Sequence, residues 1–180
     1  MLEVAWAYNN IGDAYMHWQD YENAITHFEK QIDIARQLGH VELEIYGYLN
    51  GSYCHFKAGN AEKTGTYMET AKELAEKLGH RLLIAVSHHM RGIIHGGKEE
   101  WEEAEKNFIT ALEIEDEIGS VYGLAQTNQD YGNMLVAKGE VEKGKGFLEK
   151  ARVGYDQLKN KVKAEEVEQA LKELGGKKKN

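Results

Sequence analysis

One stretch of the sequence has most of a nucleotide-binding motif. Residues 92–98 read Gly-Ile-Ile-His-Gly-Gly-Lys, and such a glycine-rich loop cradles phosphates when it follows a strand. The next residue is Glu99, where the motif needs a serine or threonine hydroxyl for magnesium. No strand is predicted before this stretch. We therefore interpret residues 92–98 as the end of a helix and the following loop, which needs glycine, rather than as a phosphate site.

The histidines raise the question of a metal site. His55 and His95 are forty residues apart, and His88 and His89 lie within two helical turns of His95. Zinc usually needs three or four ligands with supporting carboxylates, and the sequence offers neither a His-Glu-x-x-His spacing nor a second cysteine beside Cys54. The sequence therefore predicts packed or surface histidines, no metal, no cofactor and no catalytic residues. It does not indicate an enzyme.

Composition narrows the class of protein further. The 180 residues are 42% hydrophobic and 29% charged, with a net charge of −8 and no proline. An acidic protein repels phosphate backbones, so nucleic acid is not an expected partner. A membrane is not expected either, because no apolar run approaches the roughly 20 residues of a spanning helix. The single cysteine, Cys54, excludes an intrachain disulfide, fits a cytoplasmic location, and is expected to be buried and unreactive.

The sequence repeats itself every forty residues. Small residues recur in one column (Gly12, Ser52, Gly92, Gly132) and large ones in another (Phe28, Met68, Phe108, Leu148). Apolar residues within each unit recur every three or four positions, which is the period of a helix. A repeated turn closes the units, at Leu38-Gly39-His40, Leu78-Gly79-His80, Ile118-Gly119-Ser120 and Leu158-Lys159-Asn160. We predict one domain over residues 1–175 with four repeats, at about 1–40, 41–80, 81–120 and 121–160.

Each repeat is predicted to hold two helices. The first helices are expected at about 3–18, 43–58, 81–97 and 121–137, and the second at about 21–38, 61–78, 101–118 and 141–158. Asp20 and Asn60 are good N-caps for their second helices, and Gly39, Gly79 and Gly119 suit a left-handed C-terminal residue. A charged helix at about 162–174 is expected to cap the last repeat, followed by a disordered tail over 176–180.

These columns resemble the tetratricopeptide repeat. The first repeat carries the resemblance best, through Tyr8, Ile11, Gly12, Tyr15, Ala24 and Phe28. The forty-residue unit with a Leu-Gly turn is similar to those of kinesin light chains and Leu-Gly-Asn spindle-orientation adaptors. The resemblance implies an all-α, right-handed superhelical solenoid of four helix-turn-helix units plus a C-terminal capping helix. Its first helices would line a concave groove that binds an extended or helical peptide.

The expected groove follows from this resemblance. Its residues would be Trp6, Asn9, Asn10, Asp13, Tyr46, Leu49, Asn50, Tyr53, Phe56, His89, Gln129, Asp130 and Asn133. Asn10 and Asn50, with Asp130, resemble the asparagine ladder of such repeats, since an amide both donates and accepts hydrogen bonds. The aromatic residues would anchor a partner or pack between repeats. The lysines with which co-chaperone repeats grip a terminal carboxylate are missing from the matching positions, which disfavours that role.

Three functions remain open from the sequence. The first is a non-enzymatic scaffold that binds a protein or peptide partner in the groove. The second is self-assembly, for example a homodimer through the uncapped first repeat, where Leu2 and Trp6 are expected to be exposed. The third is a regulatory or sensor fragment of a longer repeat protein.

Overall fold

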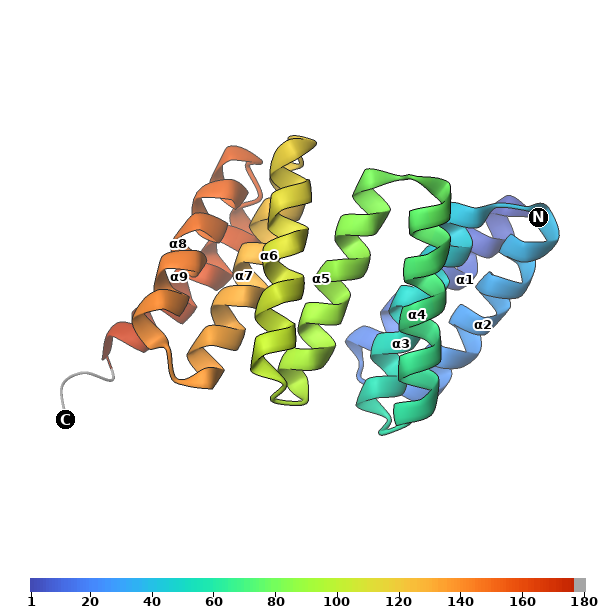
Figure 1. Cartoon of the computed structure of the whole chain (residues 1–180), viewed down its shortest axis with the longest axis horizontal. Helices are drawn as coiled ribbons and strands as arrows, with labels where there is room; N and C mark the ends of the chain where they lie inside the picture. The colour runs from blue at the N-terminus through green and yellow to red at the C-terminus, as the bar shows by residue number, and fades with distance from the viewer. Residues whose placement is uncertain (177–180) are drawn as a thin grey trace. The chain divides into compact units, whose positions relative to one another are not determined.

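Every regular element in residues 1–176, the part of the chain that the computed structural model describes, is a helix (Figure 1). The all-α fold class is therefore confirmed, and each helix begins and ends within two residues of its expected bounds. Of the tail expected over 176–180, Gly176 ends the last helix and the rest lies outside the described residues. Within those residues no helix is both long and apolar enough to cross a membrane. The helices are α1 (Leu2–His17), α2 (Tyr21–Leu38), α3 (Val41–Lys57), α4 (Ala61–Leu78), α5 (Arg81–Gly97), α6 (Trp101–Glu117), α7 (Val121–Lys138), α8 (Val141–Gln157) and α9 (Lys161–Gly176).

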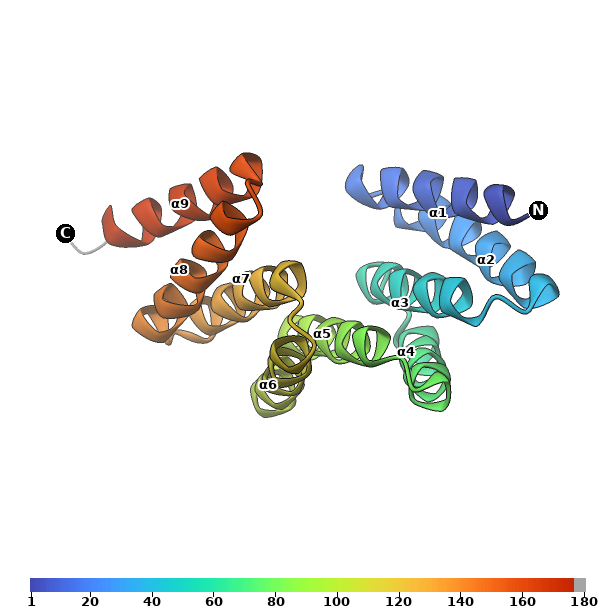
Figure 2. The ribbon, with the colours of Figure 1, turned by 90° about the horizontal axis from the view of Figure 1, so that it is seen from above.

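The chain forms two compact units, which divide within α5, between Met90 and Arg91. In the first unit α1, α2, α3 and α4 pack consecutively, and in the second α6, α7, α8 and α9 do so (Figures 1 and 2). Within each of these two sets, a helix packs against the one that follows it in the chain, which is the solenoid arrangement. The start of α5 contributes Leu83 to the core of the first unit, and its end contributes Ile93 to a core of the second.

A residue in the left-handed conformation follows helices at a regular step of twenty positions. These residues have φ between 57° and 97°, and they are Gln19, Gly39, Gly59, Gly79, Glu99, Gly119, Gly139 and Lys159. The expected left-handed conformation of Gly39, Gly79 and Gly119 is confirmed. Three of the eight are not glycine, although a side chain strains the backbone in this conformation. Every turn therefore has the same backbone shape whatever its sequence.

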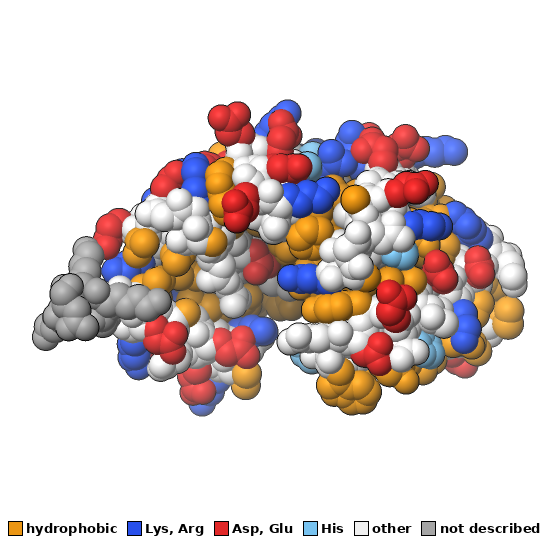
Figure 3. Space-filling view, turned by 90° about the horizontal axis from the view of Figure 1, so that it is seen from below, with side chains coloured by type: hydrophobic (Ala, Val, Ile, Leu, Met, Phe, Trp, Pro, Cys, Tyr) orange, Lys and Arg blue, Asp and Glu red, His pale blue; other side chains and the backbone are white. Residues whose placement is uncertain are grey.

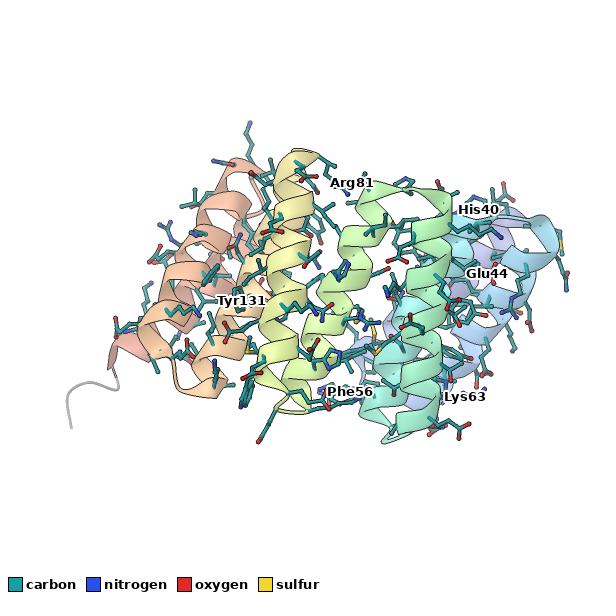
Figure 4. The ribbon with its side chains drawn as sticks, viewed as in Figure 1. His40, Glu44, Phe56, Lys63, Arg81 and Tyr131 are labelled. Carbon is teal, nitrogen blue, oxygen red and sulfur yellow. The ribbon has the colours of Figure 1, made fainter. Side chains whose placement is uncertain are left out.

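Side chains cap the helices in two ways. Asp20 and Asn60 cap the second helices as expected, since each accepts a hydrogen bond from the backbone N–H three residues later, at 3.3 and 3.1 Å. Glu100 and Glu140 make no such bond. The residue after each Leu-Gly turn also caps the next helix, a role the sequence did not reveal. His40 does so at the start of α3 (Figure 4), and the full set is His40, His80, Ser120 and Asn160.

The small-residue column lets the two helices of a repeat approach each other. A Cβ on Gly12 would lie 2.6 Å from the ring of Phe28, and one on Gly92 would lie 2.8 Å from the ring of Phe108. Both distances are shorter than van der Waals contact. The large ring of the second helix thus lies directly on the backbone of the first, and Phe108 also stacks on Tyr131 of α7 at 5.3 Å (Figure 4).

Charges of both signs cover the face shown in Figure 3, with hydrophobic side chains between them on both units. One cluster joins three helices of the second unit. Glu105 of α6 accepts hydrogen bonds from Tyr131 and Lys138 of α7 and from Lys143 of α8. Burial by itself would raise the pKa of Glu105, but the three hydrogen bonds outweigh it and hold this pKa below its usual range. The carboxylate therefore fastens α6 to the next repeat.

Candidate functional site

The half-buried Asp13 carboxylate lies between α1 and α3, the first helices of the first two repeats. Asn9, one turn earlier on α1, donates from Nδ2 to Asp13 Oδ2 at 3.1 Å. Asn50 of α3 donates from Nδ2 to Asp13 Oδ1 at 3.3 Å. Burial raises the pKa of Asp13, and the Asn9 hydrogen bond and the nearby His17 oppose that rise. Both carboxylate oxygens are thus held in place by amide donors, at a position where the negative charge is costly to maintain.

The amide column expected from the sequence passes through this cluster. Because a hydrogen bond joins Asp13 and Asn50, these two residues lie at the same height along α1 and α3. Asn10 and Tyr46 each lie about one turn before that level on their helices, and Tyr53 lies about one turn after it. Asn10 is exposed, and no hydrogen bond links it to another described residue. Of the two asparagines of this column in the first unit, Asn10 is therefore exposed and Asn50 is anchored on the Asp13 carboxylate.

The aromatic residues of the first unit differ in how much of them is open to solvent. Trp6 is 42% exposed, whereas Tyr46 packs against the core. The ring of Tyr53 meets Tyr21 edge-on at 6.4 Å. The Lys57 ammonium lies 5.4 Å from the Tyr53 ring centroid and 5.7 Å from that of Phe56. Tyr53 of the second repeat thus packs against Tyr21 of the first repeat, whereas the apolar surface of Trp6 is open to solvent.

The remaining expected residues are less uniform. Leu49 is 2% exposed within the core and His89 is 8% exposed, so neither side chain offers much surface to a partner. In the second unit, Gln129 accepts a hydrogen bond from the Tyr155 hydroxyl at 2.8 Å, and Asn133 is exposed. Asp130, which is half-buried, completes the set. The first unit therefore carries the only Asn–Asp–Asn cluster among the expected residues.

Cys54 lies behind the carboxylate cluster and is fully buried. Burial, and next to it the charge of Asp13, raises the pKa of its thiol to about 12. Since the thiolate is the reactive form of cysteine, the folded protein keeps Cys54 unreactive at neutral pH. The expectation of a buried cysteine is confirmed, and the raised pKa agrees with the expected lack of reactivity.

The residues that suggested other chemistry have structural roles. The glycine-rich stretch 92–98 is helical through Gly97, so its backbone N–H groups are used within α5. The expected helix end is confirmed, but the expectation of a loop that needs glycine is wrong, because the left-handed residue of this turn is Glu99. His95 pairs with Glu100 across the following turn, and His55 packs edge-on against Tyr67 at 4.9 Å. Among the described residues, no group of three or more histidine, cysteine or acidic side chains is arranged to hold a metal.

The second unit contains a hollow that the sequence did not predict. Its volume is about 280 Å³, and it opens beside two expected groove residues, Asp130 and Asn133. The rest of its lining comes from Gly92, Ile93, Gly96, Gly97, Trp101, Phe108, Met134 and Ala137. The repeated sequence does contain a sign of this hollow. Several of its lining positions hold smaller residues than the equivalent positions eighty residues earlier, in the first two repeats.

Comparison with known proteins agrees with this architecture. A family profile described as a tetratricopeptide repeat matches residues 7–38, while no curated protein matches the chain by sequence. The crystal structure of the apo form of RapI is similar, with a TM-score of 0.71 and 16% identity over 93% of this chain. Aspartyl phosphate phosphatase F from Bacillus subtilis has a TM-score of 0.62 and 15% identity over 96% of this chain. A Rap protein complexed with Competence and Sporulation Factor has a TM-score of 0.55 and 16% identity over 93% of this chain.

This chain spans 61%, 49% and 50% of the lengths of those three proteins, respectively. At such low identity the likeness concerns the fold alone, a succession of packed helix pairs. The matched repeat, the forty-residue period and the repeated turn geometry all describe the same architecture. Residues 7–38 match the tetratricopeptide repeat, and the described residues form an all-α repeat solenoid that shares its fold with these proteins.

Proposed function

We propose that this protein is an interaction scaffold that binds an extended segment of a partner protein along the exposed side of α1 and α3. The observation that carries the proposal is the Asp13 carboxylate held between Asn9 and Asn50. Burial raises the pKa of this group, so its charge opposes folding. Charged groups kept in such places are concentrated at functional sites.

The chemistry of this surface suits a peptide backbone. Asn50 has one Nδ2 hydrogen directed at Asp13, which leaves its carbonyl and second hydrogen to pair with a backbone amide. Asn10, one turn earlier and exposed, can do the same for the next residues of the segment. Trp6 provides apolar area beside them, and large aromatic side chains commonly anchor interfaces.

The structural neighbours support a protein or peptide partner in general terms. One of them is a Rap protein complexed with Competence and Sporulation Factor, and another is named as an aspartyl phosphate phosphatase. Those descriptions concern the neighbours, which are longer than this chain. One observation favours self-association as a second candidate, because Leu2 and Trp6 are both exposed and lie one turn apart on the same face of α1.

A peptide-display selection against the purified protein provides a defined ligand for the test. The selected peptide is titrated against wild type, Asn10→Ala, Asn50→Ala and the double variant. Each lost hydrogen bond should weaken binding by about 1 kcal/mol, or about fivefold, and the double variant by about 25-fold. The matched control removes two exposed amides from second helices, with Gln37→Ala and Gln157→Ala, and should bind like wild type. Unchanged affinity in the folded double variant would refute the proposal.

A further inference from the structure

We infer that the hollow between α5, α6 and α7 in the second unit receives an aromatic side chain of the partner, accompanied by a basic residue. The inference rests on the proposed function for the idea of a bound segment, and it identifies one side chain of that segment. The hollow has a volume of about 280 Å³, close to the lower limit of about 300 Å³ for sites of drug-sized ligands. A single large side chain is the matching occupant.

The forty-residue repeat shows how the hollow arises. Its lining residues have counterparts eighty positions earlier, in the first unit, and three of the replacements remove bulk. Gly97, Asn133 and Ala137 stand where the first unit has His17, Tyr53 and Lys57, respectively.

A further replacement conserves bulk. Gly96 and Met134 stand in the columns of Met16 and Cys54. A Cβ on Gly96 would lie 2.9 Å from Met134 Cγ, so these two positions face each other. The methionine of the pair is on α7 here, whereas in the first unit it is on α1, the equivalent of α5. The space therefore opens at Asn133, Ala137 and Gly97, and the methionine forms part of its wall.

The first unit also shows what fills the matching space. There Tyr53 meets Tyr21 edge-on at 6.4 Å, and the Lys57 ammonium lies 5.4 Å from the Tyr53 centroid. Trp101 is the counterpart of Tyr21, but the residue opposite it is Asn133. The second unit thus keeps the receiving aromatic and lacks both the ring and the cation that accompany it in the first.

The lining decides the chemistry of the occupant. The apolar walls are formed by Ile93, Trp101, Phe108 and Met134. An edge-to-face contact with an indole favours an aromatic over an aliphatic side chain about two- to tenfold in affinity. Asp130 lies at the same hollow, in the column of the neutral Asn50, so its charge favours a cation nearby. Ile93 takes the place of Asp13, which makes the floor apolar here and polar in the first unit.

The test uses small amides of single amino acids as probes. N-acetyl-tyrosinamide and N-acetyl-leucinamide are titrated at millimolar concentrations, with the Trp101 indole N–H and the Gly96 and Gly97 amides followed by NMR. The tyrosine amide should shift these signals in a saturable way, and the leucine amide should bind several-fold more weakly. Equal binding of the two amides, or no response to either, would overturn the inference.

Filling the hollow with the residues of the first unit gives the matched variant. Asn133→Tyr combined with Ala137→Lys should abolish the response while circular dichroism shows an intact helical protein. A filled variant that responds like wild type would overturn the inference, and if it fails to fold, Ala137→Leu provides a smaller obstruction with the same expected loss.

The basic residue is tested with dipeptides. N-acetyl-Arg-Tyr-amide should bind several-fold more tightly than N-acetyl-Glu-Tyr-amide, and Asp130→Asn should remove the difference. No preference in wild type would overturn the assignment of the cation. Because these probes do not involve α1 or α3, they succeed or fail independently of the Asn10 and Asn50 variants that test the proposed function.

Discussion

The regular left-handed turns lead to a stability prediction. Gln19, Glu99 and Lys159 adopt φ of 61°, 62° and 57°, in places where the other turns of the series have glycine. Replacing each of the three by glycine should stabilise the protein. Their side chains are exposed and make no hydrogen bond or ion pair with another described residue that the substitution would remove, so the backbone decides the outcome.

The magnitude follows from two opposing terms. A non-glycine residue in the left-handed region costs about 1–2 kcal/mol, whereas glycine gives the unfolded chain extra freedom worth about 0.5–1 kcal/mol. The difference is a gain of about 0.5–1 kcal/mol at each position. The three turns are far apart in sequence and share no partners, so the triple variant should gain about 1.5–3 kcal/mol. For a protein of this size that corresponds to a rise in Tm of about 3–12 °C.

Urea and thermal unfolding followed by circular dichroism measure the effect. Ala58 provides the matched control, because it stands in a turn of the same series with φ of −78°, and Ala58→Gly should destabilise by about 0.5–1 kcal/mol. Since the chain forms two compact units, Gln19→Gly should act on the first unit and the other two on the second. A triple variant no more stable than wild type, with the expected loss in Ala58→Gly, would refute the reasoning.

Three further predictions concern packing, capping and pH. A Cβ on Gly92 would lie only 2.8 Å from the Phe108 ring, so the branched side chain of Gly92→Val would clash with it. This variant should lose about 1–3 kcal/mol of unfolding free energy in urea titrations. Asn60→Ala removes the cap of α4 and should cost about 1 kcal/mol in the same assay, with Asn60→Asp close to wild type. Glu105→Gln should destabilise at neutral pH, because the fold lowers the pKa of Glu105 through Lys138 and its neighbours. That contribution is present above the unfolded pKa of about 4.3 and disappears as pH falls through the lowered folded pKa, so the two proteins should converge in stability only once the pH is below that folded pKa.

Much of the architecture was readable from the sequence because its signals are local and repeated. Apolar residues every three or four positions locate the helices, and Gly39 and Gly79 locate their ends. The left-handed Gln19 and Lys159 escaped detection, since their residue types carry no turn preference and only their place in the period reveals the geometry. His40 likewise gave no capping signal, because its ring acts as an acceptor through Nδ1.

The candidate site was less predictable. Leu49 and Asn50 were both expected in the groove, yet Leu49 is in the core and Asn50 reaches Asp13. Consecutive residues on a helix point about 100° apart, and the sequence does not say which of the two directions a neighbouring helix covers. The hollow beside Asn133 depends on absent bulk at residues from separate helices. Its prediction requires knowing which side chains face each other, and that depends on packing rather than on period.

The buried position of Cys54 makes it an internal reporter of local opening. It is the single cysteine of the sequence, is fully buried in the first unit, and has a thiol pKa of about 12. A thiol-specific reagent in the native protein can react only when that unit opens, so the rate of labelling measures how often it does. The second unit is silent in this experiment. One wild-type chain therefore allows the breathing of its first unit to be timed separately, and the same measurement with a bound peptide reports whether the ligand holds that unit closed.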